Sequence, residues 1–239
     1  MTPERERILA EIAAIVCAEN LVHPTRVAID GVTASGKTTL ARELAAAVAA
    51  AGRSAIHLSL DDFHHPRAHR HRRGRHSAEG YYEDAYDVAG FAAAVLVPLG
   101  PGGDRRYRPR IHDLASDATI DEAPVEAPAD AVLVVDGSFL LRPELAGLWD
   151  VGILVEASPA VARERGTRRD AALLGGLAEA ERLYDARYLA AWRLHAAAGD
   201  PTRLAMLVVE NDDPARPRLR RTPPDRRPGR RGGGAASTP

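Results

Sequence analysis

The chain has 239 residues with a formal net charge of −1, and 45% of them are hydrophobic, which suits one α/β domain with a sizeable core. Its single cysteine, Cys17, excludes an internal disulfide and is typical of a protein from a reducing compartment. The sequence shows neither an N-terminal signal-like stretch nor an apolar run long enough to cross a bilayer. We therefore expect a cytoplasmic protein without a membrane partner.

The first predicted elements surround a glycine-rich segment. An amphipathic stretch from Pro3 to Glu19 predicts a helix on the outside of the fold. Residues 26–30 form a short apolar run, typical of a buried parallel strand. After the glycine-rich segment, an alanine-rich stretch carries Leu or Val at every fourth residue and ends at Gly52, a natural helix stop. The order is therefore strand, loop and helix.

The glycine-rich segment, residues 31–38, matches the phosphate-binding loop pattern G-x-x-x-x-G-K-[ST], in which backbone N–H groups surround the phosphates of a nucleotide. Lys37 is the only lysine, against 31 arginines, and its slim ammonium suits the β- and γ-phosphates where a guanidinium would crowd the loop. Thr38 would place its hydroxyl on Mg²⁺. The predicted nucleotide contacts are Gly31, Val32, Thr33, Ala34, Ser35, Gly36, Lys37, Thr38 and Thr39.

Four further apolar runs alternate with helical patterns. The runs cover residues 54–59, 131–135, 151–155 and 203–209. The helical patterns include residues 160–174 and 177–198. Buried strands that alternate with helices predict a doubly wound α/β fold, with a five-stranded parallel sheet covered on both faces.

Two regions depart from this alternation. Residues 61–130 hold most of the histidines and three closely spaced tyrosines, and we expect a substrate-binding insertion there. Residues 214–239 hold eight arginines and one aspartate among Pro and Gly, so we expect a disordered tail after a domain of residues 1–213. The rest of the chain is net negative and offers no general basic patch, which argues against nucleic acid as a partner, although a nucleic-acid or membrane role of the tail is the alternative.

Acidic residues follow two predicted strands, at the edge where ligands bind in such folds. Asp136 comes after the run Val-Leu-Val-Val, as a Mg²⁺-organising residue of a phosphate-loop enzyme does. Either Asp61 or Asp62 is placed to accept a proton from an attacking hydroxyl. The alternative is that these aspartates only cap turns or helices.

Arginines recur on the helix predicted after the fourth strand. Arg165, Arg168 and Arg169 would present a cationic face that closes over the nucleotide and offsets charge on the transferred group. The alternative is a solvated helix with local pairs such as Glu164 to Arg168. Residues 64–76 mix histidine with arginine, which favours a flexible cationic loop over a metal site.

Together these motifs resemble the uridine kinase group of P-loop nucleoside kinases, which includes nicotinamide riboside kinases and is related to pantothenate kinase and phosphoribulokinase. The resemblance runs from about residue 27 to 214. Residues 60–64, Leu-Asp-Asp-Phe-His, resemble the group's Asp-x-Phe-Tyr segment, whose first Asp is the catalytic base. Tyr107 and His112 keep the Tyr-x4-His spacing that holds the pyrimidine, and Asp136 stands where the group has Glu.

The resemblance implies a set of roles and has three departures. Tyr81 falls where the group grips ribose with Asp, His64 replaces a Tyr, and Gly166 thins the arginine lid. The implied catalytic residues are Asp61, Lys37, Arg165 and Arg169, with Arg168 on the nucleotide and Thr38 and Asp136 on the metal. The implied substrate contacts are Asp61, Phe63, His64, Tyr81, Tyr107 and His112.

The expected activity is ATP- and Mg²⁺-dependent phosphorylation of a primary hydroxyl of a small molecule, with the 5′-hydroxyl of a nucleoside such as uridine favoured. The alternatives are a kinase for another alcohol, of nicotinamide riboside or pantothenate type, and a non-catalytic ATP-binding regulatory protein. The sequence leaves open whether the chain forms a homo-oligomer.

Overall fold

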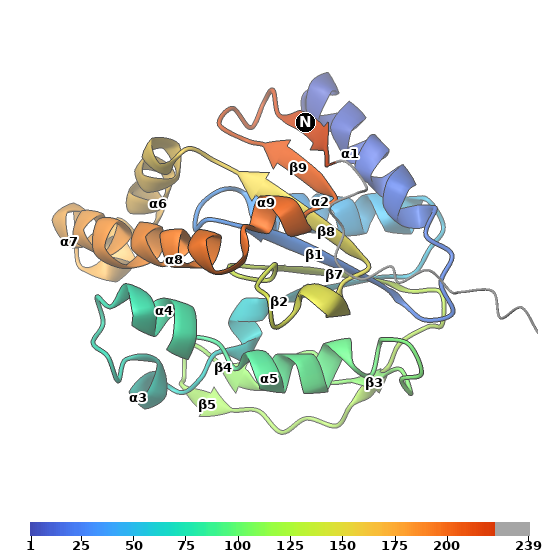
Figure 1. Ribbon diagram of the computed structural model, residues 1–239, viewed down its shortest axis with the longest axis horizontal. Coiled ribbons are helices and arrows are strands. Elements are labelled where there is room, and N and C mark those ends of the chain that lie inside the picture. The colour runs from blue at the N-terminus through green and yellow to red at the C-terminus, as the bar shows by residue number, and fades with distance from the viewer. Residues whose placement is uncertain (223–239) are drawn as a thin grey trace, which may run out of the picture.

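The computed structural model describes residues 1–222, and Figure 1 shows a twisted sheet with helices on both sides. The sheet has six strands in the order β10-β9-β8-β1-β7-β2. Their bounds are β1 Thr25–Gly31, β2 Ala55–Ser59, β7 Val132–Gly137, β8 Val151–Glu156, β9 Leu207–Glu210 and β10 Arg218–Arg221. Strand β1 pairs in parallel with β7 and β8, and parallel pairing continues to β2 and β9, so the five predicted parallel strands are present.

The sixth strand corrects the prediction of a disordered tail from residue 214. Strand β10 pairs antiparallel with β9, with Leu219 opposite Val209. Its arginines find carboxylates, since Arg220 donates to Glu210 at 2.6 Å and to Glu156 at 2.7 Å. An edge strand can be stabilised by main-chain pairing and charge balance despite its polar composition, which is why composition alone misled us. The remainder of that predicted tail, residues 223–239, lies outside the described residues.

Side chains alternate between the two faces of the sheet along each strand, and both faces are buried. On one face, Val27 and Ile29 of β1 belong to a cluster with α1 Pro3–Cys17 and α2 Lys37–Ala50. On the other face, Ala28 belongs to a cluster that includes residues of the insertion and of α8 Leu189–Gly199. Helices α6 Pro159–Leu174 and α7 Leu177–Leu183, and the short α9 Pro201–Leu204, complete the C-terminal half.

Residues 61–130 form short elements rather than a second sheet of any size. The helices are η1 Leu60–Phe63, α3 Arg67–Arg70, α4 Ala78–Asp84, α5 Val88–Phe91 and the π-helical η2 Ala92–Leu96. Two short antiparallel pairs follow. The hairpin of β4 His112–Asp113 and β5 Ala118–Thr119 lies in the chain between the paired strands β3 Arg106–Tyr107 and β6 Val125–Glu126.

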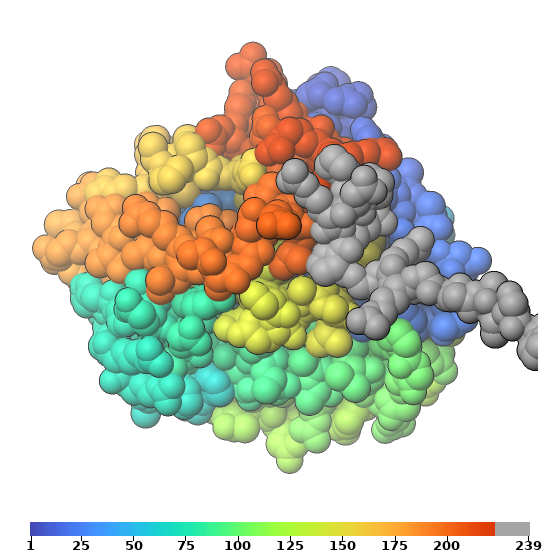
Figure 2. Space-filling model, in the orientation of Figure 1, coloured from blue at the N-terminus to red at the C-terminus, as the bar shows by residue number. Residues whose placement is uncertain are grey.

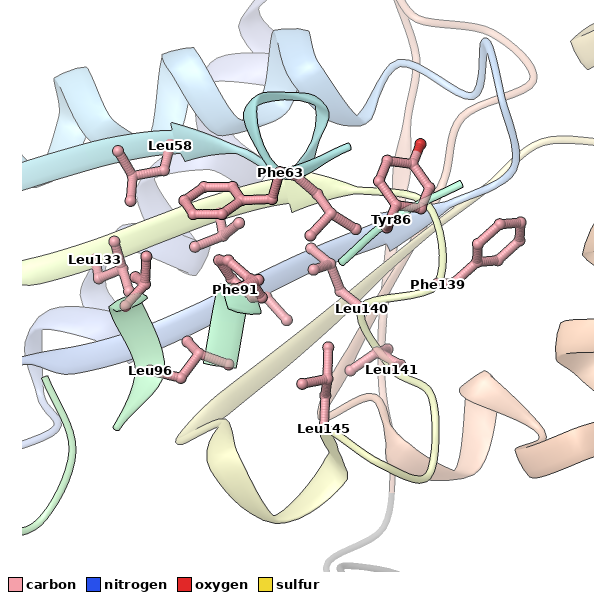
Figure 3. Packing of buried hydrophobic residues seen from close by; sticks show 14 of the residues in the cluster. Leu58, Phe63, Tyr86, Phe91, Leu96, Leu133, Phe139, Leu140, Leu141 and Leu145 are labelled. Atoms are coloured by element: carbon pink, nitrogen blue, oxygen red, sulfur yellow. The ribbon is translucent and has the colours of Figure 1, made fainter. Parts of the chain in front are cut away.

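The insertion is anchored to the sheet by aromatic and aliphatic packing. Figure 3 shows Phe63 and Phe91 beside Leu133 of β7, and the two rings meet edge to face with centroids 4.9 Å apart. At the other end, α4 packs against α8 and against the π-helical turn η4 Tyr184–Tyr188. Figure 2 shows the teal insertion residues directly against the orange helices α7 and α8. A loop with η3 Ala146–Leu148 joins β7 to β8. Within the described part of the chain, no helix combines the length and the apolar character needed to span a membrane.

Candidate active site

The phosphate-loop motif forms the turn between β1 and α2, and a residue from the far end of the chain fixes its shape. Ala34 and Gly36 have left-handed backbone angles, with φ of 66° and 99°. The Nδ2 atom of Asn211 donates to the carbonyl of Ser35 at 2.6 Å, and it would lie 2.5 Å from a Cβ on residue 36. Glycine is therefore required at 36 for both conformation and space. The free N–H groups of α2 begin directly after this turn, which suits an anion.

Lys37 lies at the start of α2 among carboxylates. Its Nζ donates to the Val32 carbonyl at 3.5 Å. Burial lowers the pKa of Lys37, while the negative charges of three nearby carboxylates, Asp61, Asp136 and Asp30, oppose that lowering. Of these, Asp61 has the largest effect. The lysine and the predicted base thus share one site at the carboxyl edge of the sheet.

Asp30, in strand β1, connects the phosphate loop to its neighbouring loop through hydrogen bonds. It is fully buried, and its carboxylate accepts hydrogen bonds from the backbone N–H groups of Gly31, Phe139 and Leu141 at 2.7–2.9 Å. The Nε2 atom of His195 lies 3.0 Å from the same carboxylate. Burial alone would raise the pKa of Asp30, but the charge of His195 and these hydrogen bonds together lower it. Asp30 therefore ties the phosphate loop to the loop after β7.

Thr38 and Asp136 are hydrogen bonded to each other, as expected for residues that share a metal ion. The Thr38 hydroxyl donates to Asp136 Oδ2 at 2.5 Å, and the Nε2 atom of His57 on β2 lies 2.8 Å from Asp136 Oδ1. The Asp136 side chain is only 3% exposed. Hard oxygen donors of this kind fit Mg²⁺. Among residues 1–222 no group of three or more His, Cys, Asp or Glu is placed to hold a metal ion.

Asp61 and Asp62 start the turn after β2 but have different surroundings. Asp61 is exposed, and the Tyr86 hydroxyl donates to its Oδ1 at 3.2 Å. Asp62 is half-buried, and its backbone carbonyl accepts from Ile111 at 3.1 Å. Burial and the negative charge of Asp61 raise the pKa of Asp62. The accessible carboxylate of the pair is therefore Asp61.

Some residues predicted to contact the phosphate acceptor lie in the core, and others lie beside the site. Phe63 is fully buried against Phe91 (Figure 3), so its side chain packs the core and presents no surface to a ligand, contrary to the prediction. The Nδ1 atom of His64 lies 2.8 Å from the Asp61 carbonyl, and its ring lies 4.3 Å from that of Tyr86. Burial lowers the pKa of His64. His64 is thus a neighbour of the site.

Tyr81, Tyr107 and His112 are all more than nine-tenths buried. The Tyr81 hydroxyl lies 3.2 Å from that of Tyr86, whose pKa burial raises well above its ordinary value. His112 Nε2 lies 3.2 Å from Asp117 Oδ1. Tyr107 packs in the core cluster of the insertion. Of these three, only Tyr81 is linked to Asp61 by a short chain of hydroxyls.

The predicted arginine face diverges in the structure. Arg165 donates to the backbone carbonyls of Asn211 and Asp212 at 2.8 and 2.6 Å, beside the phosphate loop. Arg169 pairs with Asp170 at 2.7 Å, and its positive charge lowers the pKa of Lys37. Arg168 is 80% exposed and pairs with Glu164, the local pair that the sequence offered as the alternative to a nucleotide contact. Successive residues of an α-helix lie about 100° apart around its axis, so Arg168 and Arg169 point in different directions.

Gly166 thins this face because Tyr184 needs the space. A Cβ at residue 166 would lie 2.0 Å from the Tyr184 ring, which is fully buried. The Tyr184 hydroxyl donates to Asp170 at 2.7 Å, and Asp170 holds Arg169. Where the resembled group has an arginine, this chain has Gly166, and the space is filled by the Tyr184 ring. Through Asp170, Tyr184 helps to position Arg169.

A cavity of about 360 Å³ adjoins the phosphate loop. It is lined by Ala34 and Thr39 from the loop, by Arg165 and by Pro214, together with the N-terminal residues. Its volume is within the range of small-molecule pockets. Residues after β9, Pro214 among them, therefore line a cavity beside the phosphate loop.

Comparisons with known proteins identify the fold. No protein-family model and no curated protein matches the chain. The structure of a possible uridine kinase from Bacillus stearothermophilus aligns with TM-score 0.67 and 20% identity, covering 85% of this chain and 98% of that one. A candidate fructose transport system kinase from Silicibacter sp. TM1040 aligns with TM-score 0.65 and 26% identity over 80% and 95%. D-glycerate 3-kinase from Cryptococcus neoformans aligns with TM-score 0.56 and 14% identity over 82% and 89%. The chain thus has the mostly parallel α/β fold of P-loop kinases.

Proposed function

We propose that this chain is an ATP-dependent kinase that transfers the γ-phosphoryl group to a hydroxyl of a small molecule. The observation that carries the proposal is the exposed carboxylate of Asp61 beside Lys37 of the phosphate loop. A protein that only binds ATP needs no such group, whereas transfer to an alcohol needs an acceptor for the hydroxyl proton. The three solved structures named above are described as kinases with different acceptors, which supports the general class.

Phosphoryl transfer depends mainly on positioning and on charge stabilisation. The loop amides, Lys37 and the N-terminus of α2 would hold the β- and γ-phosphates. Thr38 and Asp136 would hold Mg²⁺, which when bound neutralises charge on the phosphates. His57 keeps Asp136 in place through its 2.8 Å contact. Arg165 and Arg169 would offset the charge that develops on the transferred group.

Asp61 would accept the proton of the attacking hydroxyl. Tyr86 donates to one oxygen of this carboxylate, Oδ1, and leaves the other free to face an acceptor. Since the Tyr86 hydroxyl is itself in contact with Tyr81, the carboxylate is oriented by a buried pair of phenols. We assign the general-base role to Asp61 and not to Asp62, whose carbonyl anchors the hairpin through Ile111.

A nucleoside acceptor rests on the sequence resemblance alone. Two of its implied contacts, Tyr107 and His112, are buried, and Tyr81 replaces the ribose-gripping carboxylate. Nucleosides, nicotinamide riboside and pantothenate therefore belong in the same acceptor panel, with hydroxy acids and sugars beside them.

The test is ADP release with ATP and Mg²⁺ across this panel, followed by kinetics on two matched variants. Asp61→Asn should lower kcat by about 10²- to 10⁴-fold, the usual range for a general base, with little change in ATP affinity. Asp62→Asn, the adjacent control, should be much milder. Intact ATP binding without turnover of any hydroxyl compound would instead indicate a nucleotide-binding regulator.

A further inference from the structure

Two buried arginines, one in the insertion and one in η4, have no role in the chemistry described so far. Arg70 ends helix α3 and Arg187 lies in the π-helical turn η4, and each is 7% exposed. Within residues 1–222, Nη1 of Arg70 and Nε of Arg187 are buried and have no hydrogen-bond acceptor. An uncompensated buried guanidinium is costly, so these groups indicate a missing partner.

The carboxylates nearby do not supply that partner. Arg70 approaches only Asp117, with Nη2 and Oδ1 3.7 Å apart, which is beyond a hydrogen bond. Asp117 already accepts from the backbone N–H of Arg67 at 2.9 Å and lies 3.2 Å from His112. Burial lowers the pKa of Arg70, and the positive charge of Arg187 adds to that lowering although Asp117 opposes it. The positive charges of Arg67 and Arg187 both act on the Arg70 guanidinium in the same direction as burial.

Among the described residues, the Arg187 side chain makes one hydrogen bond and lies near two aromatic rings. Its Nη1 donates to the backbone carbonyl of Arg75 at 2.5 Å, and no carboxylate within the described residues pairs with it. The guanidinium lies over the Tyr81 ring at 4.9 Å and near the Tyr188 ring at 5.8 Å. The rings and the Arg75 carbonyl therefore hold the guanidinium in place, while its Nε has no acceptor among the described residues.

Short contacts connect these arginines to the proposed base. The ring under Arg187 belongs to Tyr81, whose hydroxyl lies 3.2 Å from that of Tyr86, and Tyr86 donates to Asp61 at 3.2 Å. On the Arg70 side, His64 lies 2.8 Å from the Asp61 carbonyl, and the charge of Arg70 contributes to lowering the pKa of His64.

We propose that the acceptor is a small hydroxylated anion, whose carboxylate or phosphate pairs with Arg70 and Arg187 while its hydroxyl faces Asp61. This inference rests on the proposed kinase function and names its substrate class. The hydroxyl oxygen forms a bond to the γ-phosphorus as the bond to the β,γ-bridging oxygen breaks. The hydroxyl proton passes to Asp61, and the products are ADP and an anionic phosphate ester. A neutral nucleoside would bring no negative charge to either guanidinium group.

The first experiment uses the wild-type chain and matched pairs of acceptors. One arm compares hydroxy acids with their amides, and a second compares sugar or polyol phosphates with the unphosphorylated compounds. ADP release should show kcat/KM at least about tenfold higher for the anionic member in one arm, and that arm identifies carboxylate or phosphate. Equal or better turnover of the neutral members, including nucleosides, overturns the inference while leaving the kinase function standing. If no acceptor is turned over although ATP binds, both proposals fail.

Variants then test the two arginines directly. With the best anion, Arg70→Gln and Arg187→Gln should each raise KM for the acceptor by about 10- to 100-fold, the range for losing a charged hydrogen bond, and change KM for ATP less than about threefold. Arg193→Gln, on the exposed face of α8, is the matched control and should change neither constant. Arg187→Lys keeps the charge and should restore part of the affinity. If the folded variants keep the wild-type KM for the acceptor, the pairing of the anion with Arg70 and Arg187 is wrong. If a variant does not fold, the comparison of charged and neutral acceptors with the wild-type chain decides the question.

Discussion

Strand β10 allows the contribution of the C-terminal segment to be measured with two truncations. One chain ends at Asp213 and lacks β10, and the other ends at Thr222 and keeps it. The shorter chain loses the antiparallel pairing with β9 and the hydrogen bond from the Thr222 N–H to the Met206 carbonyl at 3.0 Å. It also loses Leu219, which packs against the cluster of buried residues between the sheet and helices α1 and α2.

The expected magnitude follows from these contacts. A half-buried leucine contributes about 1 kcal/mol, and the exposed ion pairs of Arg220 contribute about 0–1 kcal/mol each. The backbone hydrogen bonds are largely offset by the conformational entropy that the released segment regains. We expect a loss of about 1–2 kcal/mol in the free energy of unfolding, which lowers Tm by about 2–8 °C for a domain of this size.

Thermal unfolding and steady-state kinetics check the prediction together. The chain ending at Thr222 should match the full-length protein in Tm and activity, because we expect residues 223–239 to add little to the core. The chain ending at Asp213 should also show a raised KM for ATP, since Pro214 and Ala215 line the cavity beside the phosphate loop. Equal Tm values for the two truncated chains would refute the stabilising role of β10.

Three substitutions give further tests. Lys37→Arg keeps the charge but should abolish most turnover, because the planar fork cannot enter the loop as an ammonium does, and wild-type kcat would contradict this reasoning. Asp30→Asn should lower the free energy of unfolding by about 3–5 kcal/mol in urea at pH 7, since it leaves His195 without its buried carboxylate. Because the pKa of Asp30 is lowered in the folded chain, that stabilisation is present above about pH 4 and is lost as the pH falls further, so the gap between wild type and variant should narrow there. Gly166→Ala should lower Tm and reduce kcat, because its Cβ would displace the Tyr184 ring that positions Arg169, and an unchanged crystal position of that ring with full activity would show the packing argument wrong.

Local signals in the sequence were sufficient for the parallel strands, the flanking helices and the phosphate loop. Residues 27–29 and 131–135 are apolar because both faces of these strands are covered, and this pattern can be read from each strand by itself. Antiparallel β10 was missed because its stability comes from pairing with β9 and not from its own composition.

The supporting residues of the site were missed for a similar reason. Asn211 shapes the phosphate loop across 176 residues of chain, and no local pattern distinguishes it from a turn asparagine. Arg70 and Arg187 become meaningful only when the insertion packs against η4, since each is one arginine among many in the sequence. Phe63 was misassigned because its neighbours Asp61 and His64 face the site while its own side chain turns into the core.

The π-helical turn η4 contacts residues on both the nucleotide side and the acceptor side of the proposed site. Its first residue, Tyr184, holds Asp170 and through it Arg169 beside the phosphate loop, while Arg187 lies over Tyr81 on the hydroxyl side. Five residues are too few for the two ends of the turn to move independently, so ordering one end restrains the other. Binding of nucleotide and acceptor should therefore be synergistic, and each should tighten the other by the same factor. For the proposed kinase, ATP hydrolysis measured without an acceptor should therefore be much slower than transfer to the correct alcohol.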